Sequence, residues 1–167
     1  PASTILDRIQ SEKQGITSSG KQQRQKRIEE TDDSIQPFQI PMSWAWTTYR
    51  ELAVEFRYGT SQKCSYEKEG CPVLRIPNVS IGKITTDDLK YTTLTKSEAE
   101  DLSLSIGDIL MIRSNGSLNL VGRPALVEEH VKGYCYAGYL VRVRFIPHTV
   151  DSQYLIIVLS SKFVRDQ

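Results

Sequence analysis

From Pro37 onward, the apolar residues of this 167-residue chain fall into short runs, each bounded by polar or turn-forming residues. Short runs rich in Val, Ile, Leu and aromatic residues are typical of β-strands. Helical patterns interrupt these runs at irregular intervals, unlike the regular alternation of a doubly wound fold. The sequence therefore predicts an α+β fold with a mixed, mainly antiparallel sheet and short helices. We expect strands around 52–58 and at 73–76, 108–113, 118–121, 125–127 and 139–145.

Two helices of this region have recognisable first turns. Ser97 is followed by Glu100 at capping-box spacing, which predicts a short helix over 97–102. Asp151 can cap a final helix. The spacing of its apolar residues predicts a buried side made of Tyr154, Leu155, Val158 and Leu159.

The N-terminal part has a different character. Residues 2–13 carry a helical apolar stripe of Ile5, Leu6 and Ile9, and we expect the helix to end at Gly15. A lone helix of this length is marginal in water, so we expect it to pack on something, such as a longer helix outside this chain. Residues 15–36 are polar and are interpreted as a linker, leaving 37–167 as the main domain. The basic run 21–27 within this linker is either a solvated tether or a contact to phosphates.

Motif searches give no catalytic centre. The segment "GITSSGKQ" comes close to a phosphate-binding loop, but Gln22 stands where a magnesium-binding hydroxyl is required. A serine elbow, a zinc-protease motif and a glycine-rich dinucleotide fingerprint are absent from the sequence. The three cysteines and two histidines show no zinc spacing. We therefore expect no catalytic residue, no metal site and no cofactor.

Charge and hydropathy further narrow the class of protein. Lys and Arg number 21 against 20 Asp and Glu, so any basic surface must be local. The longest apolar run, "YLIIVL", is far shorter than the ~20 residues that span a bilayer. We expect a cytoplasmic protein without membrane contact.

The segment "GDILMIRSNGSLNLVG" places polar side chains around a turn. Asn115 and Gly116 form the strongest short hairpin signal, because both residues tolerate positive φ. The side chains of Arg113, Ser114 and Asn119 are suited to nucleic-acid edges or phosphates, yet they are also ordinary loop residues. Residues alone leave these two interpretations open.

The roles of two further segments and of Arg75 are open in the same way. In "YLVRVRF", Arg142 and Arg144 leave one face of a strand, facing either phosphates or carboxylates of a neighbouring strand. Arg75 either points outward alone or is buried with a partner. The polar segment 57–70 is either a binding loop or a plain connection.

Taken together, five segments resemble one known family, the target recognition domain of the DNA specificity subunit of type I restriction-modification enzymes. The resemblance covers about Pro37 to Ser161. Its strongest part is L-R-x-x-N followed by G-D-I-L-x-x-R-S-N-G. The segments, in chain order, are "PFQIPMSWAW", "GCPVLRIPNVSIGKI", "DLKY", "GDILMIRSNGSLNLVG" and "VDSQYLIIVLSS".

The resemblance implies a non-catalytic protein that binds double-stranded DNA. Such subunits carry two recognition domains separated by a helical coiled coil, and each domain reads one half of a split site. They dock methyltransferase subunits, which bind S-adenosylmethionine, and work with a motor-nuclease subunit. The segment "PASTILDRIQSEKQ" resembles the end of the helix that precedes such a domain, which implies that residues 1–14 are the end of a helical spacer. This chain would then pair with a second recognition domain or with itself through the N-terminal helix. The alternative is a protein-interaction module that never touches DNA.

The resemblance also implies roles for individual residues. Base contacts are expected from Gln62, Lys63, Arg113, Ser114, Asn115 and Asn119. Phosphate contacts are expected from Lys83, Lys90, Arg142 and Arg144. Structural turns are expected at Gly107, Asp108, Gly116 and Gly122, whereas Arg75 and Asn78 are assigned to the scaffold.

Overall fold

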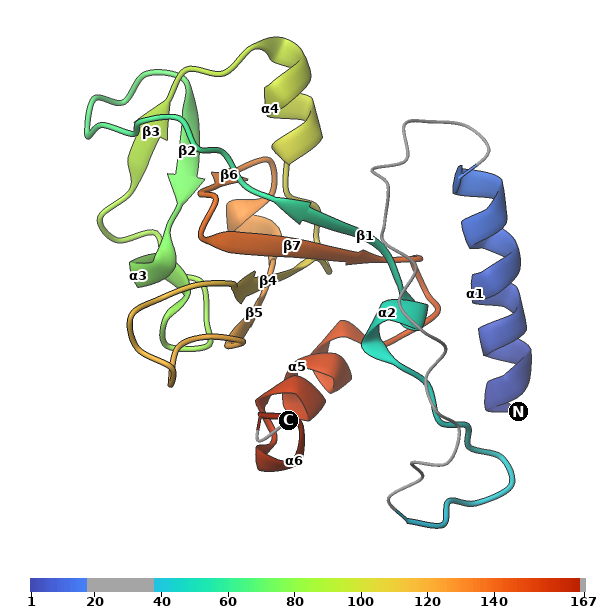
Figure 1. Cartoon of the computed structure of the whole chain (residues 1–167). Helices are drawn as coiled ribbons and strands as arrows, with labels where there is room; N and C mark the ends of the chain where they lie inside the picture. Colours follow the sequence, from blue (N-terminus) through green and yellow to red (C-terminus); the bar gives the residue numbers. More distant parts are fainter. Residues whose placement is uncertain (18–37, 166–167) are drawn as a thin grey trace. The chain divides into compact units, whose positions relative to one another are not determined.

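The computed structural model describes residues 1–17 and 38–165 (Figure 1). The chain divides into two units, Pro1–Val54 and Glu55–Gln167, and each is treated separately below. The basic run 21–27 lies outside the described residues, as does the predicted linker from residue 18 to its end. The division predicted from the sequence into 1–14, 15–36 and 37–167 stays a prediction.

The first unit contains two helices. Helix α1, Ala2–Thr17, continues past Gly15, where the sequence predicted its end. On its apolar stripe Ile9 is buried, whereas Ile5 is 47% exposed. Helix α2, Tyr49–Leu52, begins with a capping box formed by Thr48 and Glu51. The Nζ of Lys13 donates hydrogen bonds to two backbone carbonyls of α2, which ties the two helices together.

The larger unit is built on a four-stranded sheet in the order β1-β7-β4-β5. Its strands are β1, Ala53–Tyr58, β4, Ile109–Ile112, β5, Pro124–Leu126, and β7, Leu140–Phe145. Strand β4 runs antiparallel to both of its neighbours. Its residues alternate little in polarity because most of them are buried. The predicted strands around 52–58 and at 108–113, 125–127 and 139–145 correspond to these four.

A second sheet has the order β3-β2-β6. Strand β2, Cys71–Leu74, pairs antiparallel with β3, Lys90–Thr92, and parallel with β6, Cys135–Tyr136. A disulfide between Cys71 and Cys135 also joins β2 to β6. The two antiparallel pairings in the first sheet and the mixed pairing here confirm the predicted α+β class with mainly antiparallel strands.

Short helices connect the strands. They are α3, Ile76–Val79, α4, Lys96–Leu102, a 3-10 turn at Glu129–Val131, α5, Ser152–Ser160, and α6, Lys162–Arg165. No helix among the described residues is long and apolar enough to cross a membrane.

Two predictions about these helices were partly wrong. Helix α4 is capped by Thr95 and Glu98, not by Ser97 and Glu100. Both pairs have the same three-residue spacing, so the sequence pattern did not distinguish between them. Asp151 caps α5 as predicted, accepting hydrogen bonds from the backbone N–H groups of residues 153 and 154. On the expected buried side of α5, however, Tyr154 is 56% exposed.

The predicted tight hairpin at Asn115 and Gly116 is wrong. Residues 113–123 form a long connection between β4 and β5, and the predicted strand at 118–121 is a series of turns. Gly116 does not adopt the left-handed backbone that a two-residue hairpin turn needs. Instead, the side-chain oxygen of Asn115 accepts a hydrogen bond from the backbone N–H of Ser117. This local bond competes with the hairpin and widens the loop.

One hydrophobic cluster lies between the strands and helices of the larger unit. Its fully buried members include Leu74, Leu110 and Leu140, which come from both sheets. Gly59, just after β1, lies against the backbone of the segment that follows β6. A Cβ at this position would lie 2.1 Å from the carbonyl oxygen of Tyr136. A side chain at residue 59 would therefore force these two segments apart.

We predict that Gly59→Ala lowers the free energy of unfolding by about 2 kcal/mol, through overpacking against backbone. Gly116→Ala is the matched control, because a Cβ there meets nothing within 4 Å, and its effect should stay within about 0.5 kcal/mol. Urea unfolding followed by circular dichroism measures both. Equal stability of the two variants would contradict the tight approach at Gly59.

Candidate nucleic-acid interface

Three segments that are distant in sequence meet at the end of β1. The guanidinium carbon of Arg113 lies 4.3 Å from the centroid of the Tyr58 ring. The backbone N–H of Arg113 donates to the carbonyl oxygen of Tyr139 at 2.9 Å. Tyr58 and Tyr139 are 58% and 63% exposed, and Arg113 is also exposed. We call Tyr58, Arg113 and Tyr139 the aromatic–arginine cluster.

A second group of side chains surrounds β3. The Nζ of Lys90 lies 4.6 Å from the centroid of the exposed Tyr66 ring. Arg75 pairs with Asp88 at 2.7 Å, so it has the partner that the sequence left open. Hydrogen bonds from Tyr66 and Arg75 hold the pKa of the Asp88 carboxyl below its ordinary value. The positive charge here is therefore partly neutralised.

The loop that carries Gln62 and Lys63 runs from the aromatic–arginine cluster to the side chains around β3. It begins beside the aromatic–arginine cluster, where Thr60 forms an isolated bridge with Ala137. Farther along, the carbonyl oxygen of Lys63 accepts a hydrogen bond from the Thr92 hydroxyl. Gln62 and Lys63 are exposed, so their side chains are available to a ligand. Their contact with bases stays a prediction.

The remaining predicted base contacts lie on the 113–123 connection. Ser114 and Asn119 are exposed, and Asn115 is partly buried. The carbonyl oxygen of Asn119 accepts a hydrogen bond from Arg165, which links this connection to α6. Gly122, with a φ of +75°, closes the connection. The structure thus brings Arg113 beside the start of the 59–70 loop, and Ser114 follows it directly in the chain.

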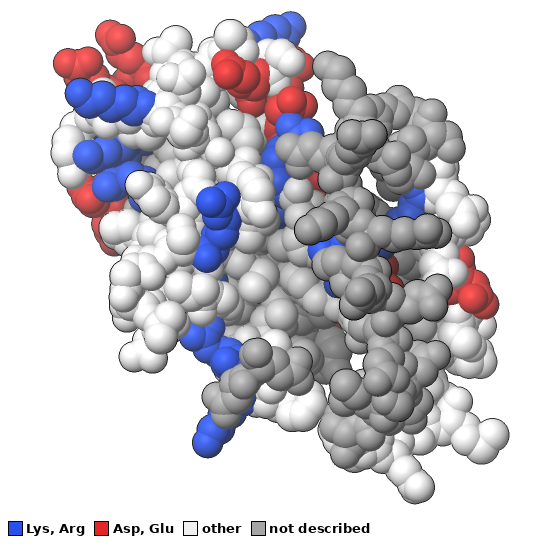
Figure 2. Space-filling view, in the orientation of Figure 1, with Lys and Arg blue, Asp and Glu red and all other residues white. Residues whose placement is uncertain are grey.

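Basic side chains do not form one continuous patch. On the face shown in Figure 2, Lys and Arg side chains form separate groups with Asp and Glu among them. Lys83 is exposed, and Lys90 is partly buried beside Tyr66. Phosphate contact by these two lysines stays a prediction. Among the described residues, no group of His, Cys, Asp and Glu is arranged to hold a metal ion.

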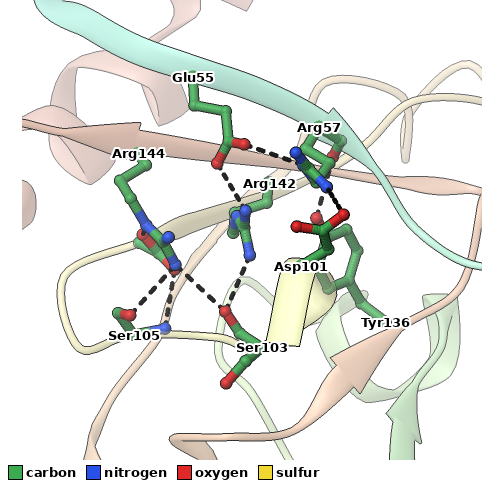
Figure 3. Close-up of polar contacts among 9 residues, drawn as sticks. Glu55, Arg57, Asp101, Ser103, Ser105, Tyr136, Arg142 and Arg144 are labelled. Carbon is green, nitrogen blue, oxygen red and sulfur yellow. Dashed lines mark hydrogen bonds and ion pairs between the residues drawn. The ribbon is translucent and has the colours of Figure 1, made fainter. Parts of the chain in front are cut away.

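The predicted phosphate contact by Arg142 is wrong. Its side chain is 2% exposed and pairs with Glu55 of β1 at 2.5 Å (Figure 3). It also donates to the carbonyl oxygen of Ser103 at 2.8 Å. Glu55 in turn pairs with Arg57, which reaches Asp101 of α4. Of the two alternatives left open by the sequence, the carboxylate partner is the one realised for Arg142.

Arg144 has a related arrangement with more exposure. It forms two hydrogen bonds to the buried carboxylate of Asp108, at 2.8 and 2.7 Å. The same carboxylate accepts the backbone N–H of Ser105, so Asp108 stabilises the turn at Gly107, whose φ is +86°. The hydrogen bonds to Asp108 raise the pKa of Arg144. Because its side chain is 32% exposed, phosphate contact by Arg144 stays a prediction, but its guanidinium is already engaged.

The remaining comparisons with the sequence predictions concern Asn78 and three exposed tyrosines. Asn78 is buried, accepts the backbone N–H of Arg75 and donates to two carbonyl oxygens, which is the scaffold role expected of it. The exposed tyrosines Tyr58, Tyr66 and Tyr139 were not among the predicted contact residues. Tyrosines next to turn-forming residues are a weak signal, because nothing local shows whether their rings are exposed.

The mixed, mainly antiparallel α+β fold carries loops with exposed aromatic, basic and amide side chains. This combination is typical of a recognition module built on a rigid scaffold. Comparison with known proteins gives the class. The chain is 26% identical over 170 residues to the EcoEI type I restriction enzyme specificity subunit of Escherichia coli, covering 99% of this chain and 28% of that protein.

Two more similar proteins are also type I restriction enzyme specificity subunits. The EcoKI specificity subunit of Escherichia coli K12 is 30% identical over 119 residues, which covers 71% of this chain and 25% of the relative. The EcoAI specificity subunit of Escherichia coli is 26% identical over 165 residues, which covers 98% of this chain and 28% of the relative. No family model matches the chain.

The chain is therefore related to the specificity subunits of type I restriction enzymes. The resemblance to a target recognition domain of such a subunit, first indicated by the sequence segments, is confirmed. The chain spans about a quarter of the length of these relatives.

We predict that Glu55→Gln lowers the free energy of unfolding by about 2 kcal/mol, since Arg142 is left buried without its countercharge. Glu129→Gln is the control: that carboxylate is exposed and 3.8 Å from Lys132, so its loss should cost less than about 0.5 kcal/mol. Urea unfolding of both variants at neutral pH provides the comparison. An equally small effect at both positions would argue against a structural role for the Arg142–Glu55 pair.

The same pair predicts a pH dependence. Burial acts to raise the pKa of Glu55, but the hydrogen bond and charge of Arg142, with Arg57, outweigh it and hold the pKa below the ordinary 4.5. The stabilisation is thus complete above pH 4.5 and is lost as the pH falls through the lowered pKa. The stability difference between wild type and Glu55→Gln should therefore shrink only below about pH 4.5. A difference that is constant down to pH 2 would contradict this assignment.

Proposed function

We propose that this chain is the sequence-specific DNA-binding module of a type I specificity subunit and that it reads one half of a split target site. The observation that carries the proposal is the similarity to three specificity subunits over most of the chain. The exposed loops 59–70 and 113–123 support it, because they present amide, basic and aromatic side chains suited to base edges.

The proposal assigns the chemistry to other subunits. The chain contributes recognition only, and methyltransferase subunits that bind S-adenosylmethionine modify an adenine near the half-site. A motor-nuclease subunit joins the same complex and cuts unmodified DNA. The N-terminal helix α1 contributes to a helical spacer, either with a second recognition domain or with another copy of this chain. We place the complex in the cytoplasm.

A protein-interaction module without DNA contact is the second candidate. One observation favours it: the segment after residue 37 exposes large apolar side chains, with Phe38, Met42 and Trp44 at 57%, 104% and 62% exposure. Exposed apolar side chains of this size are typical of protein contacts. The net charge of +1 also provides little attraction toward DNA.

The deciding experiment exchanges this region within a full-length specificity subunit. The exchanged subunit is expressed with its methyltransferase subunits, and methylated adenines are mapped across the genome. We expect a split motif in which one half changes with this region and the other half does not. An assembled, active complex whose motif stays unchanged would contradict the recognition role and favour the interaction module.

The predicted phosphate contacts can be tested separately. Lys83→Ala and Lys90→Ala should weaken binding of the assembled modification enzyme to all DNA sequences alike. Each should also reduce the slope of log affinity against log salt by about 0.9. Lys132→Ala serves as the control, because its Nζ lies 3.8 Å from Glu129 and the pair is already close to neutral. A lysine variant that changed only the preferred sequence would have been assigned the wrong role.

A further inference from the structure

We propose that Arg113 reads a guanine in the major groove and that Tyr58 is the positioning residue that holds it ready. This inference rests on the proposed DNA-binding function and goes beyond it by naming the base and the aromatic support.

Arg113 differs from the other arginines of this unit. In the described residues from Glu55 onward, six arginines donate a guanidinium N–H to an oxygen of the chain, whereas the guanidinium of Arg113 contacts only the Tyr58 ring. The six are Arg57, Arg75, Arg123, Arg142, Arg144 and Arg165. The N–H donors of Arg113 are therefore available to an external acceptor.

The position of Arg113 is nevertheless restrained. Its guanidinium carbon lies 4.3 Å from the Tyr58 centroid, and its backbone N–H is bound by the carbonyl of Tyr139. The backbone after Tyr58 is held tightly in turn: the N–H of Thr60 donates to the carbonyl of Tyr136, and Gly59 leaves no room for a side chain. A side chain that is already ordered loses less entropy on binding, so the arrangement favours affinity and specificity.

The available donors favour guanine among the four bases. A guanidinium only donates hydrogen bonds, and guanine presents two neighbouring acceptors, N7 and O6, at its major-groove edge. Adenine pairs an acceptor with a donor there, which suits an amide side chain better. Asn115 is the nearest amide in sequence, and its side-chain oxygen already accepts the backbone N–H of Ser117.

The surroundings of Arg113 favour a base over a phosphate. Tyr58 is more than half exposed, and its ring presents flat apolar area next to the guanidinium. Such area can contact a base or a thymine methyl group, whereas a phosphate offers no apolar surface. The experiment below distinguishes contact with a base from contact with a phosphate.

The experiment uses the complete modification enzyme that contains the full-length specificity subunit. Its motif is first established by methylation mapping. Binding is then measured on the cognate duplex and on duplexes in which each guanine of the relevant half-site is replaced in turn by 7-deazaguanine, which lacks the N7 acceptor. For the wild type we expect one position where the replacement weakens binding about tenfold.

Variants of Arg113 and Tyr58 then show whether Arg113 contacts that guanine and Tyr58 supports it. With Arg113→Ala, the replacement at the same guanine should cause no further loss, because no side chain then reaches N7. With Arg113→Lys, the loss should be smaller than in the wild type, because a flexible ammonium replaces the planar two-pronged contact. Arg113→Lys keeps the charge, so its salt dependence should stay close to that of the wild type. Tyr58→Leu should reduce the tenfold effect, while Tyr58→Phe should preserve it, because the ring is retained. Tyr154→Leu, at a similarly exposed tyrosine on α5, is the control and should leave the effect unchanged.

The outcomes distinguish failure of the proposed function from failure of the Arg113 assignment alone. If the wild-type enzyme binds no specific sequence through this region, the proposed function fails and the inference fails with it. If binding is specific but no guanine depends on Arg113, the inference alone is overturned. If Arg113→Ala weakens all sequences alike and lowers the salt slope, Arg113 contacts a phosphate and the guanine assignment is wrong.

Discussion

The ion pair between Arg142 and Glu55 is the interaction on which the larger unit depends. Arg142 is among the largest fully buried side chains, and a buried guanidinium needs a countercharge. Glu55 supplies the charge from β1, and the Ser103 carbonyl supplies a further acceptor. The pair thus joins the neighbouring strands β1 and β7 and connects them to the end of α4 (Figure 3). Removing Glu55 would leave the charge of Arg142 in a place that water reaches poorly.

This constraint also positions the candidate interface. Successive side chains of a strand point to opposite faces, so Glu55 and Arg57 share one face of β1 and Tyr58 belongs to the other. The ionic network therefore holds β1 without using Tyr58, whose ring stays exposed beside Arg113. A rigid strand end that displays an aromatic ring under a guanidinium is a preorganised element, which a mobile loop alone would not provide.

Local sequence signals predicted much of the fold, and their failures have physical causes. The strand over β7 and the cap at Asp151 follow from alternation and from capping chemistry, which act within a few residues. The cap of α4 was misplaced because two Thr/Ser–Glu pairs of equal spacing lie two residues apart. The hairpin at Asn115 failed because its side chain bonds to the nearby backbone, an option that Asn always has.

The sequence by itself determined the class of protein, the short-strand architecture and the common face of Arg142 and Arg144, since ordered motifs and a period of two are local properties. Only the tertiary structure decided which arginine is committed and which is free. The partners of Arg142 and Arg144, Glu55 and Asp108, lie 87 and 36 residues away along the chain. Strand periodicity gives the face on which a charge lies, but what covers that face depends on how distant segments pack. For this reason Arg142 is part of the scaffold, whereas the guanidinium of Arg113 donates to no oxygen among the described residues.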